Sequence, residues 1–177
     1  MSIKKRILVL SSEGYSFESK PVIKDFVIKK WTPGIFRFIP PNSPYSYVLF
    51  WFAHYLKIFK NNSYCTYYIE IDKRPVSSIV CIPPLFIWPF MKKDDIQTKN
   101  SYTYPEYRGQ GLAYNLKCYT LQKFCSENRT MWCLIHSDNY PSLAVNKKAG
   151  LKIIGHYKVR KKLFHFIKIG SIVPIKE

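Results

Sequence analysis

The sequence lacks the features that mark several common classes of protein. It has no CxxC pair and an odd number of cysteines, five in all, so neither a zinc site nor a disulfide framework is indicated. No apolar run reaches the roughly 20 residues that span a bilayer, and the apolar run near the N-terminus is too short for a signal peptide. These absences favour a reduced, cytoplasmic globular protein with no transmembrane segment and no metal.

Acidic residues are scarce. The chain carries 11 Asp and Glu against 28 Lys and Arg, for a formal charge of +17. Such an excess favours anionic partners, among them nucleic acid, acidic lipid and phosphorylated small molecules. Much of it also fits a solvated lysine surface, because Ile, Lys, Tyr, Phe and Asn abound as they do in proteins of AT-rich genomes. With 177 residues, nearly half of them apolar, the chain suits a single ordered domain.

The most informative segment reads YPEYRGQGLA over residues 104–113. A β-prone stretch, 96–104, leads into it, and a helical pattern begins at Leu112. Glycines at 109 and 111 let a ligand approach the backbone closely, and the first N–H groups of a helix have no partners of their own. A strand, a glycine turn and a helix N-terminus together predict a phosphate-binding site.

The spacing of this turn excludes two well-known nucleotide motifs. No Gly-Lys-Ser/Thr follows the glycines, so it is not a P-loop, and the third glycine of the dinucleotide fingerprint is missing. The pattern that remains is Arg-x-x-Gly-x-Ala, with Pro105 three residues before Arg108. It resembles the acyl-CoA-binding motif of the GNAT superfamily, the Gcn5-related N-acetyltransferases.

A second segment, residues 131–152, supports the resemblance. A short apolar strand ends at His136, a helix follows, and Gly150 suits the C-terminal cap of that helix. The second GNAT motif is similar to this arrangement, and its matching positions are Asn139, Ser142, Lys148, Gly150 and Leu151. The two motifs stand in the family's order and cover the C-terminal half of the chain.

The resemblance implies a single-domain α/β (α+β) GNAT-like fold. A central, mixed but mostly antiparallel twisted sheet of about seven strands would be flanked by helices and splayed between its fourth and fifth strands, 96–104 and 130–136. Residues 1–95 would form the acceptor-side half and 96–177 the acyl-CoA-binding half. The other expected strands are 5–11, 22–31, 64–71, 76–82, 151–159 and 162–169, and the expected helices are 45–59, 111–126 and 141–149.

The implied activity is that of an acyltransferase. It would transfer an acyl group, most simply acetyl from acetyl-CoA, to the primary amine of a small molecule. Backbone N–H groups of the glycine turn would hold the pyrophosphate, and backbone groups of the preceding strand would pair with pantetheine. Asn139 is either a pantetheine ligand or a residue at the start of a helix. The coenzyme A-binding residues implied in this way are Tyr102, Thr103, Tyr104, Arg108, Gly109, Gln110, Gly111, Leu112, Ala113, Asn139, Ser142 and Asn146.

The proton-transfer residues are less clear from the sequence. The family often has a Tyr, as acid towards the thiolate, at the position of Asn146, whose amide can donate a hydrogen bond but no proton; Tyr140 and Tyr157 are substitutes. The family's glutamate base would fall near Gln97 or Leu134, and neither can take a proton. His136, with an ordinary pKa of about 6.5, is the first candidate base. Asp95 and a chain of waters are the others.

The acceptor is expected to meet the N-terminal half and the last turn of the domain. The aromatic segment 45–59, the proline-rich loops 40–44 and 83–89 and a turn at 160–162 suit an amino sugar or a nucleotide-linked amino sugar, because aromatic faces pack on rings and basic residues pair with phosphate. Segment 45–59 also suits a homodimer face. Two alternatives stay open: a catalytically inactive GNAT-like protein that binds coenzyme A, and a basic nucleic-acid-binding module, although neither an RNP signature nor a helix-turn-helix is evident.

Overall fold

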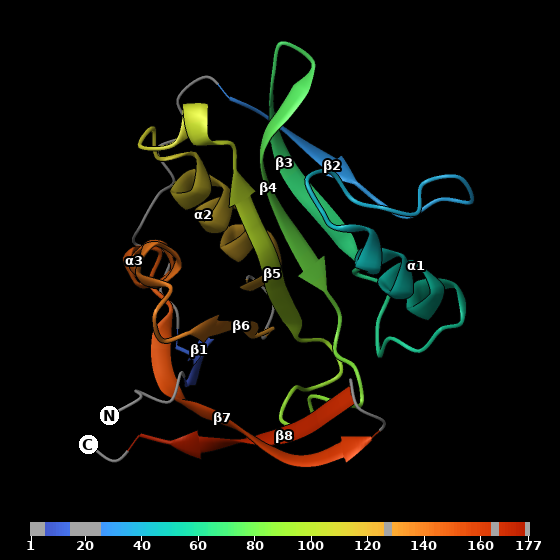
Figure 1. Cartoon of the computed structure of the whole chain (residues 1–177), viewed down its shortest axis with the longest axis vertical. Coiled ribbons are helices and arrows are strands. Elements are labelled where there is room, and N and C mark those ends of the chain that lie inside the picture. Colours follow the sequence, from blue (N-terminus) through green and yellow to red (C-terminus); the bar gives the residue numbers. More distant parts are fainter. Residues whose placement is uncertain (1–5, 15–25, 126–128, 164–166, 176–177) are drawn as a thin grey trace.

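The computed structural model describes residues 6–14, 26–125, 129–163 and 167–175. They form one mixed sheet with the strand order β2-β3-β4-β5-β6-β1-β7-β8 (Figure 1). The α/β class is therefore confirmed, and the described residues form eight strands rather than about seven. The strands are β1 (Ile7–Ser11), β2 (Val27–Trp31), β3 (Cys65–Ile71), β4 (Arg74–Ile82), β5 (Ile96–Thr103), β6 (Met131–His136), β7 (Lys152–Leu163) and β8 (Ile167–Pro174). The helices are α1 (Val48–Tyr55), α2 (Leu112–Cys125) and α3 (Tyr140–Lys148), with single 3₁₀ turns η1 (Tyr45–Tyr47) and η2 (Pro105–Tyr107).

Strands β2 to β5 form an antiparallel meander. The turn between β3 and β4 has two central residues, Asp72 and Lys73, with φ of 49° and 61°. Two positive φ values match the right-handed twist of the flanking strands, which is why this turn type joins tight hairpins. Ile71 pairs with Arg74 directly beside the turn, so the turn is confined to Asp72 and Lys73.

Strands β5 and β6 run parallel and pair over only three residues, from Ile96 with Met131 to Thr98 with Cys133. Beyond Thr98, β5 stays with β4, where a bulge places Asn100 at a φ of 47°. The Asn100 side-chain amide donates to the carbonyl of Asn42, 3.0 Å away, and so fixes the bulge. The expected splay between these two strands is present, and we call the open space beyond Thr98 the wedge.

The position of β1 was not foreseen. It pairs antiparallel with β6 on one side and with β7 on the other. The first described strand therefore lies among the strands that residues 96–177 build.

The last hairpin also differs from expectation. Residues 160–162, expected as a turn, lie inside β7, where Lys161 pairs with Ile169 and Lys162 with Lys168 of β8. None of the three residues is a Gly, Pro, Asn or Asp, the types that favour turns. The expectation that these residues form an acceptor-binding turn is therefore wrong.

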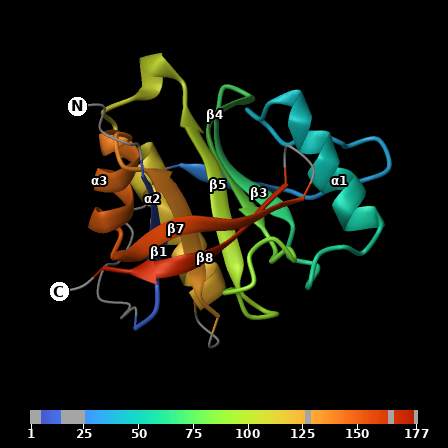
Figure 2. The ribbon, with the colours of Figure 1, turned by 60° about the horizontal axis from the view of Figure 1, so that its bottom comes forward.

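Helices cover both faces of the sheet. Side chains alternate along a strand, so Ile79 and Cys81 of β4 pack with α2 and α3, while Val80 and Ile82 pack with the segment that holds α1. Both faces of β4 are thus buried, which explains the continuous apolar run 79–82 at its end. Figure 2 shows α2 and α3 on one side of the strands and α1 on the other.

The segment around α1 keeps many large apolar side chains exposed. Phe36 is 86% exposed and Leu49 is 66% exposed, and Phe52 also lies at the surface. The loop before α1 packs on the helix through Trp51, whose indole N–H donates to the Gly34 carbonyl at 2.8 Å. Among the described residues, no helix is both long enough and apolar enough to cross a membrane.

Candidate functional site

The glycine turn forms an open cradle at the mouth of the wedge. After η2 the chain turns through Gly109 and Gly111, whose φ angles are 78° and 76°, and α2 begins at Leu112. These φ values favour glycine. A Cβ on Gly109 would meet no atom of the described protein within 4 Å. The positive φ of the turn therefore requires glycine at 109, whereas close packing does not. The space beside Gly109 is open to a ligand.

The backbone N–H groups of this cradle are mostly unengaged. Among the described residues, no acceptor is found for the N–H groups from Gly109 through Ala113. The N–H of Arg108 is different, because it donates to the Pro105 carbonyl at 3.2 Å. The Arg108 guanidinium braces the turn through Nε, 3.1 Å from the Thr103 carbonyl. The N–H of Arg108 was expected to belong to the cradle, but it is already engaged. Arg108 adds only its positive charge beside the cradle.

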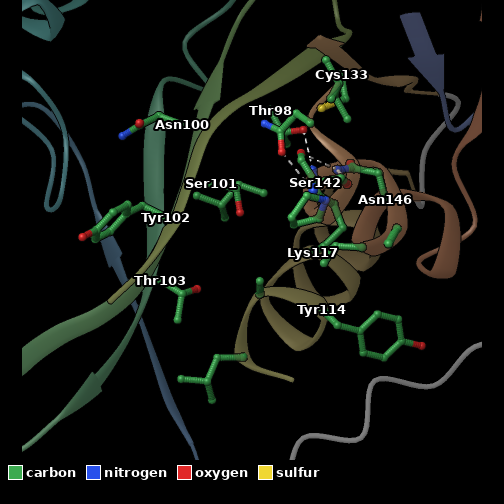
Figure 3. Close-up of a pocket in the computed structure, with 18 of the residues that line it drawn as sticks. Thr98, Asn100, Ser101, Tyr102, Thr103, Tyr114, Lys117, Cys133, Ser142 and Asn146 are labelled. Carbon is green, nitrogen blue, oxygen red and sulfur yellow. Dashed lines mark hydrogen bonds between the residues drawn. The ribbon is translucent and has the colours of Figure 1, made fainter. Parts of the chain in front are cut away.

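A pocket of about 860 Å³ continues from the cradle into the wedge (Figure 3). β5, β6 and the first turns of α2 and α3 supply most of its lining, so the two segments singled out in the sequence meet in one cavity. The predicted site residues that line it are Tyr102, Thr103, Arg108, Gly109, Gly111, Leu112, Ala113, His136, Asn139, Ser142 and Asn146. Tyr104 and Gln110 are not among the lining residues.

The backbone of Tyr104 is already used within the fold. Its N–H donates to the Val76 carbonyl at 3.0 Å, and its carbonyl accepts from the N–H of Tyr107 at 2.9 Å. The neighbouring residues Tyr102 and Thr103 keep their places beside the pocket. A pairing of this strand with pantetheine is therefore limited to residues before Tyr104.

The pocket is lined by cations and by no carboxylate. Its lining includes Lys99, Arg108, Lys117 and Lys148, and neither an Asp nor a Glu. Burial lowers the pKa of Lys99, whose ammonium lies 5.6 Å from the ring centroid of Phe50. A cavity with this charge pattern favours an anionic ligand.

Residues of the second motif are tied together by α3. Asn139 caps this helix, since its side-chain oxygen accepts from the N–H of Ser142 at 3.3 Å. The Asn146 amide donates back to the Ser142 carbonyl at 2.8 Å. Its oxygen is buried and has no hydrogen-bond partner among the described residues. Of the two roles open for Asn139, the helix-start role is thus present, and Asn139 also lines the pocket.

The candidate proton-transfer residues separate into two groups. His136 lies at the exposed end of β6 and lines the pocket. Asp95 does not line it: the residue is 1% exposed and its carboxylate accepts from the N–H groups of Lys92 and Thr130 and from the indole of Trp132. The carboxylate of Asp95 therefore organises a loop, which is a physical reason against a role as base.

The other candidates fall outside the cavity. Gln97 is buried and does not line the pocket, whereas Leu134 does. Tyr140 and Tyr157, the suggested substitutes for the acid, are not lining residues. Burial raises the pKa of Tyr157, which packs against Phe90. Among the described residues, no cluster of His, Cys, Asp and Glu could hold a metal ion.

One polar residue at the inner end of the pocket was missed from the sequence. Lys117 of α2 is 1% exposed and lines the cavity. Lys117 precedes Leu121 by four residues and Phe124 by seven, so the three side chains lie on the same face of the helix. This spacing is the sequence signal that could have identified Lys117 as buried. Its ammonium donates to the Thr98 hydroxyl at 2.7 Å.

Comparisons with known proteins agree with this architecture. No protein-family model matches the sequence, and no curated protein matches it. Among solved structures, a GNAT-family acetyltransferase from Colwellia psychrerythraea superposes with a TM-score of 0.55 at 12% identity, over 86% of this chain and 54% of that one. An acetyltransferase assigned to the GNAT family, from Novosphingobium aromaticivorans, gives 0.52 at 16% identity, over 85% and 61% of the two chains.

A third structure, a GCN5-related N-acetyltransferase from Sphaerobacter thermophilus, gives a TM-score of 0.52 at 12% identity, over 86% of this chain and 49% of that one. The chain thus spans about half to three fifths of the length of these structures. At such identities the likeness is one of fold. The protein has the GNAT fold, as the two sequence motifs predicted.

Proposed function

We propose that this protein is an acyl-CoA-dependent N-acyltransferase that transfers an acyl group, most simply acetyl, to the amine of a small molecule. The observation that carries the proposal is the row of unengaged N–H groups from Gly109 to Ala113, placed at the mouth of a cation-lined wedge. Such groups bind a diphosphate, and the adjoining helix N-terminus favours its charge. The GNAT fold of the chain supports the same reading.

The residues present fit coenzyme A. The cradle would hold the diphosphate, with Arg108 and Lys148 supplying positive charge beside it. The wedge between β5 and β6 would hold the pantetheine arm, since within the described part of the chain no strand pairs with β5 on that side beyond Thr98. The buried, unpartnered oxygen of Asn146 would accept from an amide N–H of the arm.

The chemistry is direct attack on the thioester. The amine nitrogen forms a bond to the acyl carbon, the carbon–sulfur bond breaks, and the amine loses a proton. His136 lines the pocket and would accept this proton on its imidazole. Because residue 146 is Asn, it supplies no acid, and the thiolate leaves without a proton from this position. Holding both reactants in one cavity would supply much of the rate acceleration.

The acceptor would approach from the N-terminal half. The exposed aromatic segment around α1 and the proline-rich loops 40–44 and 83–89 suit a ring-bearing amine, such as an amino sugar or a nucleotide-linked amino sugar. The cationic lining of the wedge suits an acceptor that carries phosphate. A homodimer through the aromatic segment remains part of the same proposal.

A second candidate function is coenzyme A binding without catalysis. Two observations favour it: no carboxylate lines the pocket, and the Asn146 amide is engaged with Ser142. Calorimetry with coenzyme A and acetyl-CoA tests the shared part of both proposals, and release of free thiol with a panel of amines tests catalysis. Binding without thiol release selects the second function. A protein that binds duplex or single-stranded nucleic acid at 0.15 M salt but not coenzyme A would contradict both.

A further inference from the structure

The inner end of the wedge holds a buried positive charge. Thr98 is the last residue of β5 that pairs with β6, so it marks the point where the wedge closes. Lys117 reaches this point from the second turn of α2 and donates to the Thr98 hydroxyl. That hydroxyl in turn donates to the Trp132 carbonyl, 3.4 Å away. Figure 3 shows Lys117 and Thr98 among the side chains around this end of the pocket.

This charge has no counter-ion among the described residues. The titratable groups that act on Lys117 are thiols: Cys133 from β6, Cys81 from β4, and Cys118 and Cys125 from α2 itself. β5 presents the Thr98 hydroxyl. No carboxylate is paired with it, and burial lowers the pKa of its ammonium. An ammonium buried without a partner is costly, and an anion brought beside it is held far more strongly than at the surface. The site therefore lacks one component, an anion.

The position of Lys117 places that anion at the acyl end of a bound donor. The cradle lies at the outer end of the pocket, and Lys117 lies six residues after Gly111 along α2, or about 9 Å along the helix axis. A donor held by its diphosphate would extend its acyl end into the wedge, towards Thr98. Both Lys117 and the cradle line the same cavity.

The other cations of the cavity are placed differently. Arg108 adjoins the cradle, and the Lys148 ammonium lies 4.9 Å from the ring centroid of Tyr114, in the first turn of α2. Lys99 follows Thr98 on the strand, and its ammonium lies 5.6 Å from the ring centroid of Phe50, in the segment that holds α1. Lys117 is therefore the cation that the acyl end would meet on the α2 side.

We propose that Lys117 and Thr98 form a subsite for a carboxylate at the end of the transferred acyl group. The preferred donor is then a coenzyme A thioester of a short dicarboxylic acid, of the malonyl or succinyl class. This inference rests on the proposed function, because it assumes that coenzyme A binds in the cradle. Thr98 fixes the ammonium, and the ammonium pairs with the carboxylate.

The test compares donors across variants by calorimetry. Coenzyme A, acetyl-, butyryl-, malonyl- and succinyl-CoA are titrated into the full chain, into Lys117→Met and into Lys148→Met. The unaltered protein should bind malonyl- or succinyl-CoA at least about 10-fold more tightly than butyryl-CoA. Lys117→Met, which places an apolar side chain in apolar surroundings, should remove or reverse this preference. Lys148→Met should weaken all five ligands to a similar extent.

Proton uptake gives a second readout. An anion raises the pKa of Lys117 on binding, so malonyl-CoA should bind with uptake of protons and its affinity should fall as pH rises through the lowered pKa of the free ammonium. Acetyl-CoA should show no such dependence. Titration in two buffers of different ionisation enthalpy measures the uptake.

Three results would overturn the inference, and they are distinguishable. If the unaltered protein binds acetyl- and butyryl-CoA as tightly as malonyl- and succinyl-CoA, the subsite does not exist. If Lys117→Met folds, as judged by its urea unfolding curve, but loses all ligands equally, Lys117 supports the cavity rather than a carboxylate. If no coenzyme A ligand binds the unaltered protein, the proposed function falls first.

Discussion

The wedge and the surface around α1 are built on opposite plans. In the wedge, the groups that can bind a ligand are backbone N–H groups and a few cations placed by the ends of strands and helices. Around α1, residues 26–69 contain five Lys and Arg and no Asp or Glu, and they expose aromatic side chains. The wedge thus has a geometry that specifies its ligand, whereas the α1 surface has a composition that suits several partners.

The contrast between the wedge and the α1 surface would fail most clearly if the cradle glycines were not needed for binding coenzyme A. Gly109→Ala and Gly111→Ala should lower affinity for coenzyme A by about 100-fold or more, since a Cβ at the cradle displaces the phosphate oxygens from hydrogen bonds worth about 1.5–3 kcal/mol each. Calorimetry measures the loss. Gly14→Ala is the matched control, because Gly14 has a φ of 70° and open space around it, like Gly109, but lies elsewhere. Equal losses in all three variants would show backbone strain alone.

A histidine from each region tests where the chemistry resides. His136→Ala should reduce kcat by about 100-fold if its imidazole accepts the amine proton. His54→Ala, on α1, should leave kcat nearly unchanged. Steady-state thiol release with both variants decides this. An unaffected His136→Ala enzyme would point to a water chain instead.

Asp95 sharpens the distinction between a residue that builds the site and one that acts in it. Asp95→Ala leaves the three donors from Lys92, Thr130 and Trp132 without a partner, at a cost of about 3 kcal/mol or more in the free energy of unfolding. Urea unfolding measures that cost. The variant, where folded, should keep the pH dependence of kcat. If Asp95→Ala changed the pH dependence of kcat without lowering the free energy of unfolding, Asp95 would again be a candidate for the general base.

The smallest effects are expected on the α1 surface. Leu49→Lys and Phe52→Lys should change the free energy of unfolding by about 0.5 kcal/mol or less, because both side chains are exposed. Ile79→Ala, in the core, should cost about 2–5 kcal/mol and serves as the reference. If the surface variants unfold as easily as the core variant, or change the mass of the particle in solution, the α1 surface is covered by a second copy of the chain.

The sequence predicted the wedge well, because its features are set by local rules. The glycines at 109 and 111, the strand before them and the helix after them fix one another within ten residues, and the expected bounds of β5, β6, α2 and α3 differ from the observed ones by no more than one residue at either end.

Features that depend on distant partners could not be predicted. β1 pairs with β6 and β7, which are distant in the sequence. The spacing of residues within β1 carries no information about which strands these are. Asp95 has the sequence context of a turn residue, and only the fold brings Trp132 to its carboxylate. Lys117 was passed over because a lysine is ordinarily assigned to the surface, and its burial follows from the packing of α2 on the sheet.

The placement of β1 has a consequence for how the chain is made and handled. Because β1 lies between β6 and β7, the hairpin of β7 and β8 joins the rest of the sheet through a strand that is synthesised well before its neighbours. That strand must wait for more than a hundred later residues before it has neighbours, which raises the contact order and slows folding. Substitutions that weaken β1 should therefore loosen the hairpin of β7 and β8, which is distant in the sequence.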